Sequence, residues 1–452
     1  MAEKIAAVAT GHARTGIGIL RLSGDGCIEA AGQVFHLQSG KPLSALPDRK
    51  LALGTLFDVQ GRPIDHCMAF ISRAPHSYTG EDTAEIQCHG SPAALAAGLE
   101  ALFAAGFRQA RPGEFTRRAF LNGRMDLTQA EAVIDLIDAE TADAAANAAG
   151  QIAGAMRKRI DPVYDSWVDI CAHFHAVLDY PDEDIEDFTL ERYRADIARC
   201  TETLERLRAS YDSGRLMNSG IPAAIVGRPN AGKSSLLNAV LGYDRAIVTN
   251  IPGTTRDTIE EKLLLGGVLL RLTDTAGIRE TSDEIERMGV SRSRRAMEHA
   301  ELVLAVIDGS RELTGEDTEL IKCAERAPHG IVILSKHDLG SAAAVPETAL
   351  PVVELSSVTG EGLKELEDTV RELFPEPSAP AGEILTNARQ FDAVSRALES
   401  MKAAEDAMKN GCTPDIVLTE TETAMAALGE LTGRTVREEV TNRIFERFCV
   451  GK

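Results

Sequence analysis

A glycine-rich segment has the composition and spacing of a phosphate-binding loop. It runs from Gly227 to Ser235 as GRPNAGKSS and matches the pattern G-x-x-x-x-G-K-[ST]. The apolar run at 223–226 predicts a buried strand before it, and residues 235–241 predict a helix after it. Glycines let the backbone curve around phosphates, so that several N–H groups point inward at the helix N-terminus. In such a loop Lys233 reaches the β- and γ-phosphates, and the Ser234 hydroxyl binds Mg²⁺.

Further segments follow in the order that a GTPase requires. Asp274-Thr275-Ala276-Gly277 comes after an apolar strand, where an aspartate can hold Mg²⁺ through water and a glycine N–H can sense the γ-phosphate. The segment 249–257 (TNIPGTTRD) lies before it, and a threonine there can complete the magnesium shell. In Ser335-Lys336-His337-Asp338, the last residue can accept two hydrogen bonds from guanine that adenine does not supply. With Ser356-Ser357-Val358 as a looser guanine-contacting segment, the set predicts GTP and resembles translation-factor-like GTPases.

Two positions depart from the usual GTPase pattern. Ser335 replaces the asparagine of N-K-x-D that ties the base loop to the phosphate loop, which puts that support for affinity in question, while Asp338 keeps guanine specificity. Ile278 occupies the place of the common water-orienting glutamine and can do no acid–base work. The nearby carboxylates either orient water or form a solvated loop; they are Glu280, Asp283, Glu284 and Glu286. Positive charge beside the phosphates could come from Arg256, from Arg279, or from a monovalent cation held by Asn230 and carbonyls of residues 249–254.

The elements that must position these residues fall into distinct regions. Residues 1–118 alternate β-like runs and turns, with strands at 16–24, 51–59, 67–72 and 84–89 and a helix at 91–105. His66-Cys67 and Cys88-His89 match no zinc spacing, because adjacent strand residues point to opposite faces, so no zinc is predicted. The region has an α+β pattern.

Helical patterns occupy the residues on either side of the nucleotide-binding segments. Thr128 and Glu131 have the spacing of a capping box, Pro162 should break or kink the helical stretch 126–178, and a helix at 190–213 should stop at Gly214. Residues 384–448 are helical again. Between them, apolar runs alternating with helices predict a doubly wound parallel sheet; the runs are 223–226, 268–273, 302–307, 331–334 and 352–355.

The fold class is therefore an α+β N-terminal domain and a discontinuous all-α domain with an inserted α/β P-loop domain. The predicted domains are 1–118 (N-terminal), 119–215 and 384–452 (helical), and 216–374 (G domain), with a linker at 375–383.

Composition limits the class of protein. At 452 residues the chain is long enough for about three domains, and its 44% hydrophobic content supports real cores. The net charge of −21 argues against broad non-specific binding to nucleic acid. A local patch could still bind RNA or simply face solvent; its arginines are Arg108, Arg111, Arg117, Arg118 and Arg124. The cysteines form no C-x-x-C pair and no apolar run could span a bilayer, so a cytoplasmic protein with reduced thiols is expected.

Over essentially its full length the chain resembles the bacterial tRNA-modification GTPase family MnmE, also called TrmE. The carrying segments are Gly16–Gly24, Tyr78–Asp82, Arg111–Phe115, Gly227–Ser235, Gly253–Asp257 and the terminal Phe448–Lys452. The resemblance implies a G domain activated by K⁺-dependent dimerisation and an N-terminal domain that binds folate and forms a homodimer. It also implies an FAD-dependent MnmG partner, in a heterotetramer. The pair would add an aminomethyl or carboxymethylaminomethyl group to C5 of the wobble uridine of certain tRNAs.

The resemblance also assigns site residues. The GTP contacts would be Asn230, Ala231, Gly232, Lys233, Ser234, Ser235, Thr249, Asn250, Ile251, Pro252, Gly253, Thr254, Thr255, Asp274, Thr275, Ala276, Gly277, Ser335, Lys336, Asp338, Ser356, Ser357 and Val358. Mg²⁺ would be held by Ser234 and Thr255, and K⁺ by Asn230, Thr249, Ile251 and Thr254. Glu286 would orient the attacking water through a bridging water, with Lys233 also counted as catalytic. A 5-formyl-tetrahydrofolate site would involve Arg21, Glu85, Arg124 and Lys452, where cations suit an anionic folate and the carboxylate can accept from the pterin ring.

Two questions stay open at the level of sequence. Cys449 lies near the C-terminus beside Lys452, and it is either a nucleophile with a lowered pKa or a packing residue at the folate pocket. The alternative function is a regulatory GTP switch, for example in ribosome assembly, that performs no one-carbon chemistry. The folate residues and the Cys-Val-Gly-Lys tail favour the modification enzyme.

Overall fold

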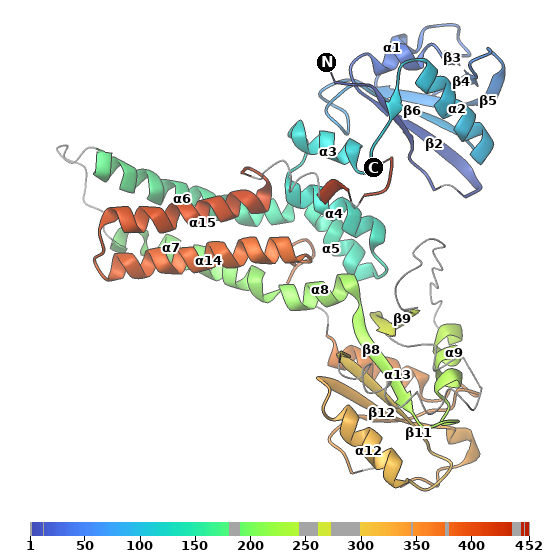
Figure 1. The fold of residues 1–452 in the computed structure, drawn as a ribbon, viewed down its shortest axis with the longest axis vertical. Helices are drawn as coiled ribbons and strands as arrows, with labels where there is room; N and C mark the ends of the chain where they lie inside the picture. The colour runs from blue at the N-terminus through green and yellow to red at the C-terminus, as the bar shows by residue number, and fades with distance from the viewer. Residues whose placement is uncertain are drawn as a thin grey trace. The chain divides into compact units, whose positions relative to one another are not determined.

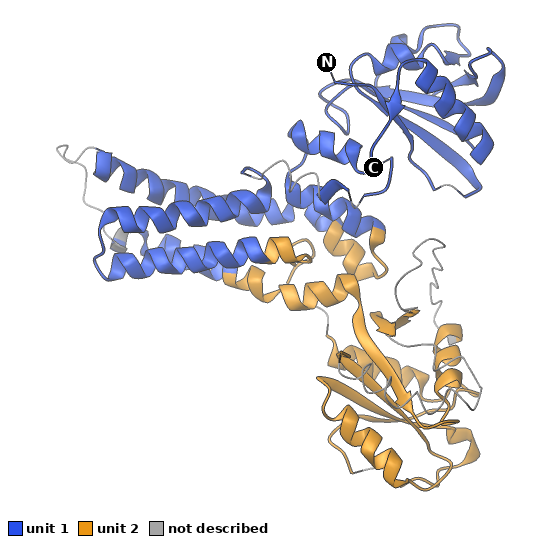
Figure 2. Ribbon diagram, viewed as in Figure 1, with its two compact units in different colours: residues 1–137, 149–204, 392–452 blue, residues 138–148, 205–391 orange. Residues whose placement is uncertain are grey.

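A computed structural model describes residues 2–11, 13–179, 190–243, 261–272, 299–344, 347–375, 379–435, 444–446 and 448–451. The chain divides into two compact units, which Figure 2 colours separately. Unit 1 contains residues 1–137, 149–204 and 392–452, and unit 2 contains residues 138–148 and 205–391. None of the helices in the described ranges combines the length and apolar character needed to cross a bilayer.

Unit 1 begins with a sheet whose strand order is β3-β4-β5-β6-β2-β1-β7 (Figure 1). Neighbouring strands are antiparallel except for β1 and β7, which are parallel. The strands are β1 (Ile5–Val8), β2 (Thr15–Ser23), β3 (Phe35–Leu37), β4 (Ala52–Phe57), β5 (Pro63–Ser72), β6 (Thr83–Gly90) and β7 (Arg108–Gln109). The four predicted strands are confirmed as β2, β4, β5 and β6, and the predicted helix is α2 (Pro92–Ala104).

The two faces of this sheet have different chemistry because side chains alternate along each strand. Leu20, Leu22 and Ile86 belong to a buried core that also contains Leu95 and Leu102 of α2. A short helix α1 (Cys27–Ala31) and a 3₁₀ turn η1 (Leu43–Ala45) contribute to the same core. The residues between the buried ones point to the opposite face, so the charged side chains of β2 and β6 lie together there.

Most of the other described helices outside the G domain form a long antiparallel bundle. These other helices are α3 (Glu114–Leu121), α4 (Leu127–Asp138), α5 (Ala142–Ile152), α6 (Ala155–Asp179), α7 (Leu190–Ala209), α14 (Ala388–Lys409) and α15 (Pro414–Thr432). Helices α6 and α15 pack side by side (Figure 1). Trp167 and Phe174 of α6 and Leu428 of α15 are buried. Helices that precede and follow the predicted G domain in sequence therefore pack together, and the inserted arrangement is confirmed.

Two local predictions about helices in unit 1 are wrong. Helix α4 begins at Leu127, so its N-cap is Asp126 rather than Thr128. Asp126 Oδ1 accepts from the Gln129 backbone N–H at 2.9 Å, and the Gln129 side chain accepts from the Asp126 N–H at 2.9 Å, which is a complete capping box. Helix α6 also continues through Pro162, so of the two predicted outcomes, a break or a kink, the break is wrong; the residues around Pro162 keep their apolar face buried.

The predicted stop at Gly214 is also wrong. Helix α7 ends at Ala209, and Gly214 lies inside the next helix, α8 (Tyr211–Ser219). A Cβ on Gly214 would lie 2.1 Å from the carbonyl oxygen of Leu385, so the glycine allows close contact with the chain that leaves the G domain. The Leu385 N–H donates to Ser210 Oγ at 3.1 Å, and the Gly382 N–H donates to Asn147 Oδ1 at 2.7 Å. These contacts fasten that exit segment to α5 and α8.

Unit 2 contains a sheet with the order β13-β12-β11-β8-β10-β9. Its strands are β8 (Ile221–Gly227), β9 (Glu261–Leu265), β10 (Val268–Leu272), β11 (Leu302–Asp308), β12 (His329–Ser335) and β13 (Val352–Glu354). All neighbours are parallel except β9 and β10. Besides α8, the described helices that follow in unit 2 are α9 (Lys233–Tyr243), α12 (Gly315–Ala324), α13 (Leu363–Leu373) and the 3₁₀ turn η2 (His337–Leu339). Buried apolar clusters lie on both sides of the sheet, which confirms the doubly wound α/β fold.

Candidate functional site

The phosphate loop connects the end of β8 to the start of α9, as the motif predicts. Lys233 Nζ donates to the carbonyl oxygens of Gly227 and Arg228, both at 2.8 Å, so the lysine spans the loop. A Cβ on Gly227 would lie 2.4 Å from the Val306 carbonyl oxygen of β11, which explains the glycine there. Asn230 has a φ of 59°, a left-handed conformation that curves the loop. The loop therefore has the bend and the lysine that a polyphosphate requires.

Ser335 connects the base loop to the phosphate loop, although it replaces the asparagine that usually does so. Its Oγ is 2.5 Å from the Ala231 carbonyl oxygen in the phosphate loop and 2.9 Å from the Ile307 carbonyl oxygen of β11. One hydroxyl proton serves these two acceptors, and the residue is only 1% exposed. The serine thus ties the base loop to the phosphate loop in its own way.

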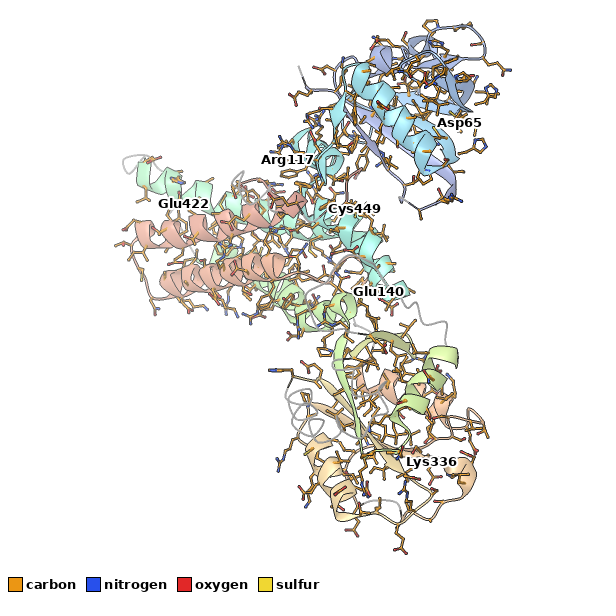
Figure 3. All side chains as sticks on the ribbon, turned by 45° about the vertical axis from the view of Figure 1, so that its right-hand side comes forward. Asp65, Arg117, Glu140, Lys336, Glu422 and Cys449 are labelled. Atoms are coloured by element: carbon orange, nitrogen blue, oxygen red, sulfur yellow. The ribbon has the colours of Figure 1, made fainter. Side chains whose placement is uncertain are left out.

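The remaining base-loop residues are held by an acidic group and a second serine. Lys336 Nζ donates to Asp308 Oδ2 at 2.8 Å at the end of β11 (Lys336 is labelled in Figure 3). Burial raises the pKa of Asp308, but hydrogen bonds from Lys336, Ser310 and Arg311 outweigh it and hold that pKa well below its usual range. Ser356 Oγ donates to Asp338 Oδ1 at 2.7 Å, which orients the carboxylate predicted to bind guanine. The two predicted base-contacting segments therefore meet.

The structure leaves part of the predicted site outside its described residues. These positions are Thr249, Asn250, Ile251, Pro252, Gly253, Thr254, Thr255, Arg256, Asp274, Thr275, Ala276, Gly277, Ile278, Arg279, Glu280, Asp283, Glu284 and Glu286, together with Lys452. Of the predicted ion ligands, Asn230 and Ser234 are described, and both are exposed on the phosphate loop.

Arg21 and Glu85 lie opposite each other on β2 and β6. The antiparallel register pairs them directly, and Arg21 Nε donates to Glu85 Oε1 at 2.8 Å. The Arg21 guanidinium lies 5.7 Å from the Tyr78 ring centroid and 5.9 Å from the Phe115 ring centroid. A cation beside an exposed aromatic ring and a carboxylate can bind a planar, hydrogen-bonding anion.

The C-terminal segment returns to this same place. An Arg21 terminal nitrogen donates to the Gly451 carbonyl oxygen at 3.2 Å, across 430 positions of sequence. Val450 forms a bridge with Pro112, and the Gly113 N–H donates to the Cys449 carbonyl oxygen at 3.4 Å. The Cys449 side chain is exposed on this segment (Figure 3).

Arg124 reaches the site through the loop that carries Tyr78. Its Nε donates to the Ser77 carbonyl oxygen at 3.2 Å, and its side chain lies against Gly80. Tyr78 Oη and Thr116 Oγ1 are 2.9 Å apart, and this hydrogen bond holds the tyrosine ring against α3. Sequence reasoning did not single out Tyr78 and Phe115 as aromatic partners of Arg21, because the cation and the rings come from separate elements.

Part of the predicted arginine patch is neutralised by carboxylates. Arg108 pairs with Glu3 and Glu114, while Arg118 pairs with Glu114 and Glu81. Burial raises the pKa of Glu114, but hydrogen bonds from Arg108, the Arg111 N–H and Arg118 prevail and lower it to about 2. Arg108 and Arg118 are therefore paired with carboxylates within the domain.

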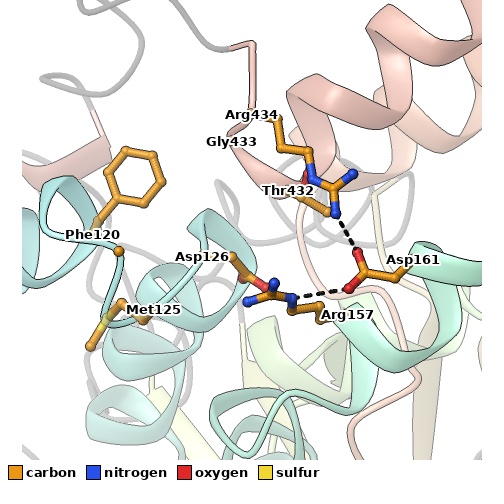
Figure 4. A pocket seen from close by; sticks show the side chains of 9 residues that line it. Phe120, Met125, Asp126, Arg157, Asp161, Thr432, Gly433 and Arg434 are labelled. Atoms are coloured by element: carbon orange, nitrogen blue, oxygen red, sulfur yellow. Dashed lines mark hydrogen bonds and ion pairs between the residues drawn. The ribbon is translucent and has the colours of Figure 1, made fainter. Parts of the chain in front are cut away.

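A pocket of about 260 Å³ lies elsewhere in unit 1 (Figure 4). Asp161 bridges Arg157 at 3.1 Å and Arg434 at 2.9 Å on its wall. Its lining residues are Phe120, Gly123, Met125, Asp126, Arg157, Asp161, Thr432, Gly433 and Arg434. The GTP and folate residues predicted from sequence are not among these lining residues of the described chain.

Comparison with known proteins agrees with this arrangement. A family model described as the MnmE helical domain matches residues 127–449, and one described as the GTP-binding protein TrmE N-terminus matches residues 4–124. A tRNA modification GTPase MnmE from Symbiobacterium thermophilum is 43% identical over 455 residues, covering 100% of this chain and 99% of that relative. Relatives of the same name from Moorella thermoacetica and Heliobacterium modesticaldum are 42% and 41% identical, with the same coverage. This chain therefore belongs to the MnmE (TrmE) family, the GTP-binding P-loop GTPases of tRNA modification.

Proposed function

We propose that this GTPase is stimulated by K⁺ and works with an FAD-dependent MnmG-type protein in the cytoplasm. The pair would add an aminomethyl or carboxymethylaminomethyl group to C5 of the wobble uridine of certain tRNAs. A tetrahydrofolate, such as the 5-formyl form, would supply the one-carbon unit. The contact between Arg21 and the Gly451 carbonyl oxygen carries this proposal, because it brings the C-terminal segment to a residue assigned to the folate site. A protein that acts only as a GTP switch would have no use for a one-carbon carrier.

The proposal assigns a task to each predicted domain. Residues 1–118 bind folate and form the homodimer, and residues 119–215 and 384–452 form the helical domain. Residues 216–374 hydrolyse GTP, and the segment 375–383 links that domain to the second helical half. The contacts of Asn147 and Ser210 with the exit segment support a coupling between hydrolysis and the helices.

In the G domain, the described residues fit a magnesium nucleotide. Lys233 would contact the β- and γ-phosphates, Ser234 would hold Mg²⁺ together with Thr255, which lies outside the described residues, and Asp338 would bind guanine. Asn230, Thr249, Ile251 and Thr254 offer amide and carbonyl oxygens, which are the ligands that suit K⁺. When bound, K⁺ supplies positive charge beside the phosphates, the role that an arginine finger has in other GTPases. Glu286 orients the attacking water.

Steady-state GTP turnover in equal concentrations of KCl and NaCl tests the cation proposal. Turnover should be faster in KCl, and Asn230→Ala should remove the difference. The matched control is Asn238→Ala, since this amide is exposed on α9 beyond the loop. Equal turnover of the wild-type protein in the two salts would count against the cation site.

Glu286→Ala tests the water-orienting assignment. We expect turnover to fall by about 100-fold or more, the usual scale for a group that handles a reacting water, with GTP binding largely intact. Glu284→Ala is the control from the same acidic segment. Near-normal turnover in the Glu286 variant would remove this assignment.

Folate fits the chemistry of the N-terminal site. Arg21 and Arg124, with Lys452 from the tail, would bind the anionic glutamate or ring oxygen, and Glu85 would accept from the pterin amine. Tyr78, which is 42% exposed, places an aromatic ring beside Arg21, which suits a flat ring system. When bound, the folate supplies the one-carbon group; Cys449 remains available as a nucleophile near the same site.

Calorimetry with 5-formyl-tetrahydrofolate tests this site directly. Arg21→Ala removes a charge-assisted hydrogen bond of about 1.5–3 kcal/mol, so affinity should fall roughly tenfold or more. Arg62→Ala is the control because Arg62 is an exposed arginine of the same domain, paired only locally with Asp58 and Gln60. Unchanged affinity in the Arg21 variant would refute the contact.

The open face of the N-terminal sheet supports the proposed homodimer. Leu53 and Met68 pair directly across β4 and β5 and are 41% and 42% exposed. Ile17, at the near end of β2, is 59% exposed. Large apolar side chains gathered on an uncovered sheet face mark a protein interface. A twofold dimer through this face could then bind two MnmG-type partners as a heterotetramer.

A further inference from the structure

Three possible metal ligands meet on two helices that are distant in sequence. Cys171 and His175 are four residues apart on α6, so they lie on one side of that helix. Glu422 comes from α15, where Figure 3 labels it. The Cys171 Sγ, a His175 ring nitrogen and a Glu422 carboxylate oxygen all lie within 4.8 Å of one another.

The geometry approaches that of a tetrahedral site. His175 Nε2 and Glu422 Oε1 are 3.1 Å apart. Two ligands bonded to zinc at about 2.0–2.1 Å, at the tetrahedral angle, stand roughly 3.3 Å apart. Cys171 is buried while the other two residues are exposed, so the thiol forms the floor and one position opens to water.

The pairing of His175 with Glu422 alone does not account for the cluster. An exposed ion pair is worth about 0–1 kcal/mol, and it requires no thiol beneath it. The second cluster in the described residues, Asp65 with Cys67 and Cys88, is a weaker candidate. There the Asp65 carboxylate already accepts from His89 at both oxygens, and both thiols are buried in the sheet core.

We propose that Cys171, His175 and Glu422 bind a zinc-class divalent ion that joins α6 to α15. Sulfur, imidazole and carboxylate together suit Zn²⁺ or Co²⁺, whereas Mg²⁺ and K⁺ prefer oxygen alone, so this ion is distinct from those at the nucleotide. Binding replaces the thiol proton, which passes to solvent. Since α6 precedes the G domain and α15 follows it, the ion would fasten the two halves of the helical body together.

Cobalt and zinc ions alone are the probes, added to the reduced, full-length chain without a histidine tag. Thiolate coordination gives Co²⁺ a charge-transfer absorption band, and Zn²⁺ should displace it at one ion per chain. Trp167 is the only tryptophan and lies one helical turn before Cys171, so its fluorescence provides a second readout. Zn²⁺ should also raise the melting temperature of the wild-type protein.

Variants separate this site from other thiols. Cys171→Ser should abolish the band, and His175→Gln should weaken binding at least about tenfold, because loss of even an outer-shell partner costs about 10–100-fold. His175→Gln changes an exposed residue, so this variant should fold, yet Zn²⁺ should no longer raise its melting temperature. His173→Gln and Cys88→Ser are the matched controls and should bind like the wild type.

Three results would overturn the proposal. The first is no charge-transfer band in the wild-type protein. The second is a band that survives Cys171→Ser or disappears in Cys88→Ser. The third is equal zinc stabilisation of the wild type and His175→Gln.

Discussion

Replacing Ser335 by alanine tests whether a serine can do the work of the usual asparagine. The change removes one hydroxyl that lies 2.5 Å from the Ala231 carbonyl oxygen of the phosphate loop. Ser335 is 1% exposed, so water cannot readily take the place of the lost donor. The phosphate loop would then be less well organised before GTP arrives.

The size of the effect follows from the buried acceptor. A buried carbonyl left without its donor costs about 1–3 kcal/mol. The Ile307 carbonyl shares the same hydroxyl proton, so the expected loss of free energy is that of one shared hydrogen bond and not of two full ones. If about 1–2 kcal/mol appears in binding, GTP affinity falls roughly 5–30-fold. Preference for GTP over ATP should persist, because Asp338 and its partner Ser356 are unchanged.

Equilibrium titration with a fluorescent GTP analogue measures the change, with a melting curve as the check on folding. Ser310→Ala is the matched control, since the Ser310 hydroxyl donates to Asp308 in the same network rather than to the phosphate loop. Binding of GTP by folded Ser335→Ala within about twofold of the wild type, or equally weak binding by Ser310→Ala, would contradict this role of the serine.

Three further predictions concern stability and assembly. Gly214→Ala places a Cβ 2.1 Å from a carbonyl oxygen and should destabilise unit 2 by about 1–3 kcal/mol in urea unfolding. Gly242→Ala, with open space around it, is the control and should not destabilise the protein. Equal urea midpoints for the two variants would contradict the close contact. The lowered pKa of Glu114 means that its stabilisation is present above pH 4.5 and is lost as pH falls from 4.5 toward 2. The protection factors of amides in β1 and β2, corrected for the pH dependence of intrinsic exchange, should therefore fall over that range in the wild type and change less in Glu114→Gln; identical pH dependence would refute the ion-pair account. Met68→Glu should convert the proposed dimer to monomers in sedimentation equilibrium while Phe103→Glu, on α2, should not; a Met68 variant that stays dimeric would exclude this face.

Sequence patterns predict the elements that are defined locally. Buried parallel strands are continuous apolar runs, so β8, β11 and β12 were identifiable, and the phosphate loop follows from its own glycines and lysine. The edge strand β9 begins with Glu261-Lys262 and pairs in a hairpin, so it lacks that signal. The predicted helix end at Gly214 was wrong because the position needs a glycine for a different reason. A side chain there would clash with the Leu385 carbonyl oxygen, more than a hundred residues later in the chain.

The candidate site shows the same division between local and distant information. The sequence indicates that Ser335 departs from the family pattern, but only the fold shows that its hydroxyl meets Ala231. Arg21 and Glu85 are individually recognisable by resemblance, whereas their direct pairing depends on the register of β2 with β6. The spacing of Cys171 and His175 is visible in one helix, but Glu422 joins them only through the packing of α15 on α6.

Nucleoside analysis of tRNA from cells lacking this protein tests the central claim most directly. The wobble uridines of the affected tRNAs should lose their aminomethyl or carboxymethylaminomethyl group. Expression of the wild-type chain should restore it, and Lys233→Ala, which removes the phosphate-loop lysine, should not. Normally modified wobble uridines in the deletion strain would contradict the account.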